Sequence, residues 1–137
     1  MGYNFRLPDL NCALGISQLK KLKKFTIRRR EISKIYDKLF SDKKKFITPK
    51  KIKNTVNTYH LYPLMINFSF IKKTKEKIIK EFLKHKIKLQ VHYIPVNTQP
   101  FYKRKYGFNK NNYKNSSLFF KSCISLPIYY DLKDVEI

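Results

Sequence analysis

The chain begins with Met1-Gly-Tyr-Asn-Phe-Arg-Leu-Pro-Asp-Leu-Asn-Cys-Ala-Leu-Gly-Ile-Ser-Gln-Leu-Lys-Lys-Leu22, in which a polar and aromatic cluster runs directly into an amphipathic helix. Pro8 suits the first turn of a helix, and Asp9 suits the positive end of the helix dipole. Apolar residues then recur with a helical period to about Phe40. The pattern predicts one long or kinked helix, or two in succession. Gly15 is costly inside a helix, so its presence suggests close backbone packing or a local bend, and we expect packing.

The rest of the chain alternates strand and helix signals. A lysine-rich connection is followed by an expected strand, in which Pro63 favours an edge position or an interruption. Further helices and strands follow, with a structured loop from Tyr93 to Tyr102 that runs into a short helix closed near Gly107. The expected elements are strands within Thr58–Phe68, Lys88–His92 and Ile124–Pro127, and helices Lys75–His85 and Tyr113–Cys123, the last after an Asn-rich turn. This order predicts an α+β sandwich with a long lead-in helix.

Composition favours one globular domain with a strongly basic surface. The 137 residues contain 31 Lys plus Arg against 9 Asp plus Glu, a formal charge of +22. Such a charge attracts nucleic acid or anionic membranes, so a small basic nucleic-acid-binding module is one reading. However, the lysines are scattered, and abundant Asn, Ile, Phe and Tyr accompany them, as expected from A/T-rich codons. We therefore expect no specific nucleic-acid partner.

Other site classes are not indicated. Cys12 and Cys123 are too few and too separated for a disulfide framework or a zinc site, so we expect reduced thiols and no metal. No early apolar run resembles a signal sequence, and no stretch approaches the roughly 20 apolar residues of a spanning helix. We expect a cytoplasmic protein without a membrane partner.

Several segments together resemble the DegT-type nucleotide-sugar aminotransferases, pyridoxal-phosphate (PLP) enzymes of fold type I. Within that family, the sequences of these segments are most similar to those of the enzymes that aminate a UDP-linked 4-keto sugar in pseudaminic acid biosynthesis. The segments are Gly2-Tyr-Asn-Phe-Arg6 with Ala13-Leu-Gly-Ile-Ser-Gln-Leu19, Arg28-Arg-Arg-Glu-Ile32 with Tyr36-Asp37, Tyr59-His-Leu-Tyr-Pro63, Gln90-Val-His-Tyr-Ile-Pro95, Gln99-Pro-Phe-Tyr102 and Ser125-Leu-Pro127.

The resemblance implies a domain organisation. Residues 1–41 would form an interdomain or dimer-interface helical segment, and residues 42–137 the small C-terminal α/β sandwich domain, incomplete at its end. The large PLP-binding domain and its cofactor lysine would be absent, so we expect no catalytic residue here and no activity from the chain alone. A homodimer, or a separate N-terminal half, would complete the enzyme. A free-standing assembly subunit that completes another chain's site is an alternative.

The resemblance also implies a reaction and site residues. The parent enzyme would move an amino group from an amino donor, glutamate, to a UDP-linked 4-keto-6-deoxy sugar for cell-surface or flagellar glycans. Asn4 would reach across the dimer to the phosphate of the partner subunit's PLP, with Arg6 also near the cofactor. Tyr3, His92 and Tyr93 would contact the nucleotide-sugar substrate. The residues alone favour Asn4 as a helix cap or turn residue and Arg6 as part of a surface ion pair, and only the motif reverses this; His92 could equally be a structural residue.

Three further positions carry weaker expectations. His60 is expected to be structural and hydrogen-bonded at a strand start, and His85 to be solvent-exposed at a lysine-rich helix end. Asn97 stands where histidine is common in the resembled family. That departure bears on substrate identity and not on fold.

Overall fold

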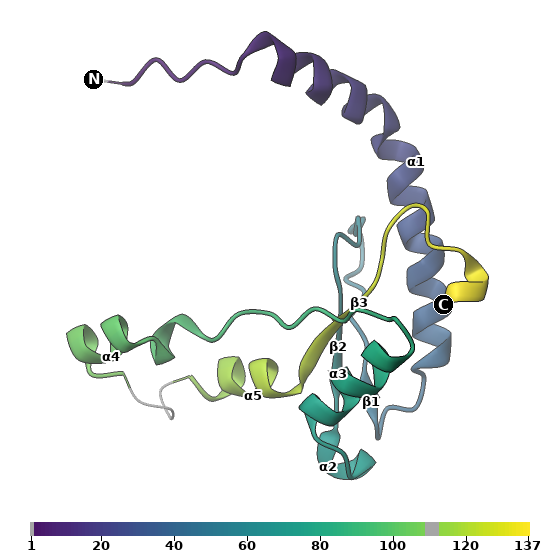
Figure 1. The fold of residues 1–137 in the computed structure, drawn as a ribbon, viewed down its shortest axis with the longest axis vertical. Coiled ribbons are helices and arrows are strands. Elements are labelled where there is room, and N and C mark those ends of the chain that lie inside the picture. Colours follow the sequence, from purple (N-terminus) through teal and green to yellow (C-terminus); the bar gives the residue numbers. More distant parts are fainter. Residues whose placement is uncertain (1, 109–112) are drawn as a thin grey trace.

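The computed structural model describes residues 2–108 and 113–137, so the expected Asn-rich turn lies outside the described residues. The architecture is α+β, with a long helix leading into a small antiparallel sheet, as predicted (Figure 1). In chain order the elements are α1 (Asp9–Leu39), β1 (Phe46–Ile47), β2 (Tyr62–Ile66), α2 (Phe68–Ile71), α3 (Lys75–Lys84), η1 (Val96–Thr98), α4 (Pro100–Tyr106), α5 (Lys114–Ser122), β3 (Cys123–Leu126) and η2 (Asp134–Glu136).

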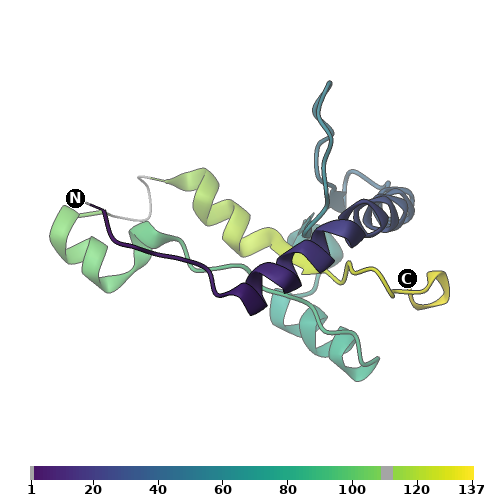
Figure 2. The same cartoon turned by 90° about the horizontal axis from the view of Figure 1, so that it is seen from above.

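Helix α1 is a single element of 31 residues that begins directly after Pro8. Its C-terminal half packs on the sheet, where Ile32, Ser33 and Tyr36 are buried. Residues 2–24 are all exposed, and this half of the helix extends away from the body (Figures 1 and 2). The expected close packing at Gly15 is not found within the chain, because a Cβ atom there would meet nothing within 4 Å.

The sheet has the order β1-β2-β3, so β2 is the central strand. The expectation that Pro63 lies on an edge strand is therefore wrong. Pro63 nevertheless has no strand beside it on the β1 side, because β1 pairs only with Met65 and Ile66 and ends before Pro63. On the β3 side, Pro63 lies opposite Ser125, whose backbone N–H and carbonyl are both hydrogen-bonded to Gln90. No hydrogen bond between β2 and β3 therefore requires the N–H that Pro63 lacks.

The strand expected at Lys88–His92 is reduced to a bridge between Gln90 and Ser125, with backbone N···O distances of 3.1 and 2.8 Å. The neighbouring hydrogen-bonded pairs cannot form. Pro127 has no N–H to offer at one end of the bridge. At the other end, the N–H of Cys123 is bonded to the carbonyl of Phe119 as the last turn of α5 closes. The chain therefore leaves the sheet after one pair and continues as the loop that carries His92.

Helices α1 and α3 cover one face of the sheet and form the core with it. The cluster of buried residues comprises Ile32 and Tyr36 of α1, Ile78 of α3, Tyr62, Leu64 and Ile66 of β2, Ile124 and Leu126 of β3, and Tyr59, Ile128 and Leu132 from the connections. The remaining expectations for helices are confirmed: α3 begins after the cap Thr74, α4 ends at Gly107 with φ of 64°, and α5 follows residue 113.

Two tyrosine hydroxyls of the core make hydrogen bonds. Tyr36 donates to the carbonyl of Pro127 at 2.6 Å, and Tyr62 donates to Oδ1 of Asp37 at 2.8 Å. Burial raises the pKa of Tyr36 to about 12. Burial, followed by the hydrogen bond to the Asp37 carboxylate, also raises the pKa of Tyr62. Both phenols must therefore stay protonated in the folded state.

These tyrosines predict alkaline unfolding. Because the pKa of Tyr36 is higher in the folded than in the unfolded protein, its protonated phenol contributes to folding stability in full below about pH 10, the pKa of the unfolded state. This contribution is lost as the pH rises through the folded-state pKa of about 12. Over this pH range, ionisation of Tyr36 alone should lower the free energy of unfolding by about 3 kcal/mol. Far-UV circular dichroism against pH, read with tyrosinate absorbance, measures the midpoint. Tyr36→Phe should move the midpoint to higher pH, whereas the exposed Tyr93→Phe should not; identical midpoints for all three proteins would contradict the assignment.

Candidate functional site

The N-terminal candidates lie together in an exposed, extended segment before α1. Arg6 donates from Nε to Oδ1 of Asn4 at 3.1 Å, and the rings of Tyr3 and Phe5 lie 5.5 Å apart. Asn4 does not cap a helix, because α1 has Pro8 at its N-cap with no side-chain cap, but it lies in a three-residue turn closed by the N–H of Phe5 donating to the carbonyl of Tyr3 at 3.1 Å. Arg6 makes no ion pair among the described residues. The pair leaves the amide N–H groups of Asn4 and the terminal nitrogens of Arg6 as outward donors.

The second pair of candidates follows the Gln90 bridge. His92 is half-buried and its Nε2 is hydrogen-bonded to the hydroxyl of Ser125, while Tyr93 is 90% exposed. The two rings lie 6.4 Å apart. The structure therefore gives His92 a fixed partner and leaves Tyr93 free of the body of the protein.

The two groups of candidates are not brought together by this chain. The Tyr3–Arg6 segment and the loop from His92 to α4 project toward the same side of the molecule (Figures 1 and 2). Within residues 2–108 and 113–137, no hydrogen bond or ring contact joins them. A single site that used both groups would need further protein between them.

A pocket of about 550 Å³ lies beside the His92 loop, between residues 94–98 and α5. Ile94, Leu118 and Phe120 line its apolar wall, and Lys114 and Lys121 add positive charge. The combination suits a ligand with an apolar ring and an anionic group. The sequence did not indicate this pocket, because its two walls are about twenty residues apart in the chain.

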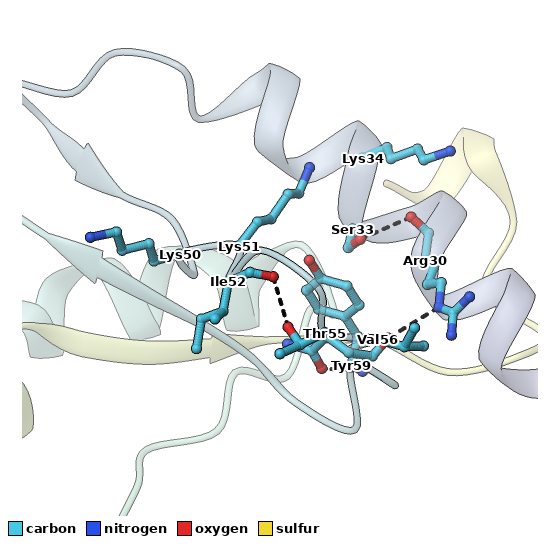
Figure 3. Close-up of a pocket in the computed structure, with 10 residues that line it drawn as sticks. Arg30, Ser33, Lys34, Lys50, Lys51, Ile52, Thr55, Val56 and Tyr59 are labelled. Carbon is cyan, nitrogen blue, oxygen red and sulfur yellow. Dashed lines mark hydrogen bonds between the residues drawn. The ribbon is translucent and has the colours of Figure 1, made fainter.

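A second, basic pocket of about 340 Å³ lies between α1 and the 50–59 loop (Figure 3). Its cations are engaged or divergent: Arg30 donates from Nε to the carbonyl of Asn57 at 3.1 Å, and Lys51 pairs with Asp37 at 2.8 Å. Lys34 and Lys50 point away from each other (Figure 3). We interpret these contacts as docking of the loop on α1, since the charges do not converge on a common point.

The other titratable residues that drew attention have ordinary surroundings. His85 is exposed, as predicted. His60 is also exposed and makes no hydrogen bond within the described part of the chain, so the structural role expected for it is wrong. Every described lysine is exposed except Lys75, which is half-buried. Its ammonium donates to the carbonyl of Phe120 at 2.7 Å, and burial lowers its pKa.

The described residues contain no cluster of three His, Cys, Asp or Glu side chains that could hold a metal ion. No helix in that part of the chain is long and apolar enough to cross a membrane.

Comparison with known proteins places these features in context. The model of the DegT/DnrJ/EryC1/StrS aminotransferase family matches residues 1–137. The UDP-4-amino-4,6-dideoxy-N-acetyl-beta-L-altrosamine transaminase of Campylobacter jejuni is 38% identical over 138 residues, which cover 99% of this chain and 36% of that protein. The spore coat polysaccharide biosynthesis protein SpsC of Bacillus subtilis is 31% identical, over 99% of this chain and 35% of its own length.

A solved structure is similar over the same region. Helicobacter pylori PseC, an aminotransferase of pseudaminic acid biosynthesis, superposes with a TM-score of 0.85 at 31% identity, covering 99% of this chain and 36% of that one. The chain thus spans about a third of the length of the relatives that it matches, at 36% and 35%.

Proposed function

Because this chain belongs to the DegT/DnrJ/EryC1/StrS aminotransferase family, we propose that it serves as the C-terminal part of a nucleotide-sugar aminotransferase. The supporting observation is the exposed Asn4 and Arg6 pair, which precedes a helix half whose residues are exposed as far as residue 24. Donors placed in this way are suited to a site that another body completes. Residues 1–41 would then be the interface segment and residues 42–137 the small domain, although Ile32 and Tyr36 already pack into the core of the latter.

Aminotransferases of this family depend on PLP. The free amide N–H groups of Asn4 and the guanidinium of Arg6 fit the cofactor's phosphate, because fork-shaped, charge-assisted donors bind such oxygens well. When bound, PLP supplies the electron sink for amino transfer. Its covalent lysine would come from the other part of the enzyme, since the half-buried Lys75 is engaged with a backbone carbonyl and the remaining described lysines are exposed.

We assign the substrate by similarity to the altrosamine transaminases and to PseC. The proposed acceptor is a UDP-linked 4-keto-6-deoxy sugar, the proposed donor is glutamate, and the product would serve glycan biosynthesis. His92 and Tyr93 would contact the nucleotide sugar from one side, and Tyr3 would do so from the N-terminal segment. The parts act together only in a dimer or with an added large domain, so the chain by itself should be inactive.

A segment exchange tests this function. The matching third of the Campylobacter jejuni transaminase is replaced by this chain, and amination of the UDP-4-keto sugar is measured with glutamate and PLP. We expect the chimera to be active and the same relative without any C-terminal segment to be inactive. Asn4→Ala and Arg6→Ala should each weaken PLP retention about tenfold or more, because each removes a charge-assisted or amide bond to the phosphate.

Matched controls separate binding from folding. Asn115→Ala and Arg104→Ala change the same residue types at exposed positions outside the proposed site and the interface segment, and should leave PLP retention unchanged. A folded, dimeric chimera that holds PLP but turns over no UDP-4-keto sugar would refute the assigned substrate. A chimera in which the Asn4 and Arg6 variants retain PLP like the controls would refute the role of these residues.

A further inference from the structure

Ser125 is a polar residue in a strand that is otherwise apolar. It is 1% exposed, and its neighbours Cys123, Ile124 and Leu126 are also buried. Its backbone N–H and carbonyl are both used by Gln90. The side chain is therefore held at one place on the sheet, and its hydroxyl has to find a partner there.

The partner found for that hydroxyl is Nε2 of His92. A hydroxyl has one proton to donate and can also accept, whereas a neutral imidazole has one donor and one acceptor nitrogen. If Nε2 carried the proton, the hydroxyl would accept it and its own O–H would remain buried without an acceptor among the described residues. An unmade bond of a buried donor is costly. The lower-energy arrangement has Ser125 donating to an unprotonated Nε2.

From this arrangement we propose that Ser125 is a positioning residue that fixes the tautomer and ring orientation of His92. Neutral His92 then carries its proton on Nδ1, on the opposite edge of the ring from Ser125. The loop thereby presents an oriented N–H donor, which suits an oxygen of the nucleotide sugar, a hydroxyl or a phosphate oxygen. This step rests on the proposed function for its ligand, but the coupling of Ser125 to His92 does not.

Long-range ¹H–¹⁵N NMR of the imidazole rings tests the coupling in the chain itself at a pH where histidine is neutral. Compared with that of His60 and His85, the ratio of the Nδ1–H to the Nε2–H form of His92 should be about fivefold to tenfold higher, the factor of one hydrogen bond. The exposed His60 and His85 are internal controls without such a partner. Ser125→Ala should abolish the excess at His92 alone, and Ser125→Thr, which keeps the hydroxyl, should restore it. His92→Gln assigns the resonance.

Opposite results would overturn the proposal. A tautomer ratio of His92 no higher than that of His60 and His85 in the unmodified chain would do so, as would a ratio unchanged by Ser125→Ala in a variant whose circular dichroism and Gln90 amide protection are retained. The chimera separates this failure from failure of the proposed function. There, Ser125→Ala and His92→Gln should raise KM for the UDP sugar with little change in kcat. If the tautomer follows Ser125 but His92→Gln leaves KM unchanged, the substrate role of His92 is wrong and the coupling stands.

Discussion

Tyr62→Ala is expected to lower the free energy of unfolding of the protein at 25 °C by about 3–5 kcal/mol. Tyr62 is 0% exposed and begins β2, the central strand of the sheet, with its ring 5.0 Å from that of Tyr36 and 6.3 Å from that of Tyr59. Truncation of a buried aromatic side chain costs about 3–5 kcal/mol, which is a large part of the total stability of a small domain. Urea unfolding followed by far-UV circular dichroism measures the loss.

Two comparisons identify the cause. Tyr62→Phe keeps the ring and loses only the hydrogen bond to Asp37, which retains its ion pair with Lys51, so we expect a loss of about 1–2 kcal/mol. Tyr93→Ala removes the same atoms from a 90% exposed position and should change stability by less than about 0.5 kcal/mol. A Tyr62→Ala protein as stable as Tyr93→Ala would show that the core is not organised around this ring.

The triple variant Leu10→Glu, Leu14→Glu and Leu19→Glu is expected to convert a self-associating chain into a monomer. These leucines are 81%, 59% and 68% exposed, in a helix segment with no charged residue between Asp9 and Lys20. A helix segment that exposes several large apolar side chains and carries no charge is ordinarily covered by other protein. Without that cover, copies should associate through it. Sedimentation velocity over a range of concentrations gives the oligomeric state.

A control of equal charge makes the test specific. Glutamate at Val56, Leu83 and Val135, which are exposed elsewhere on the surface at 72%, 60% and 92%, should leave self-association in place. The helix variant should also keep the unfolding midpoint of the unmodified chain, because Leu10, Leu14 and Leu19 are exposed and outside the buried core. An unmodified chain that is monomeric at all concentrations would contradict the interface assignment of this helix. In the chimera, the helix variant should lose both dimer and activity.

Interactions between residues close in sequence could be predicted, and those between residues far apart in sequence could not. Asn4 and Arg6 are two residues apart and belong to one motif, so the sequence shows both positions together, while their role at the cofactor stays a prediction. The partnership of His92 and Ser125 spans 33 residues, and the contact of Arg30 with the 50–59 loop spans 27. No local pattern encodes such contacts. Ser125 did carry a signal that was overlooked, since it is a lone hydroxyl in a buried apolar strand.

The sequence by itself determined the helix from Asp9 to about residue 40, the order of elements and the family motifs, because periodicity, the Pro8 start and residue identity act over a few neighbours. Only the tertiary structure decided that Pro63 is tolerated in a central strand and that the Gln90 strand stops after one pair. Both outcomes depend on which backbone groups of Ser125, Cys123 and Pro127 remain available once the sheet and α5 have formed. Which backbone donors and acceptors are already hydrogen-bonded depends on contacts between distant parts of the chain, so only the tertiary structure shows it.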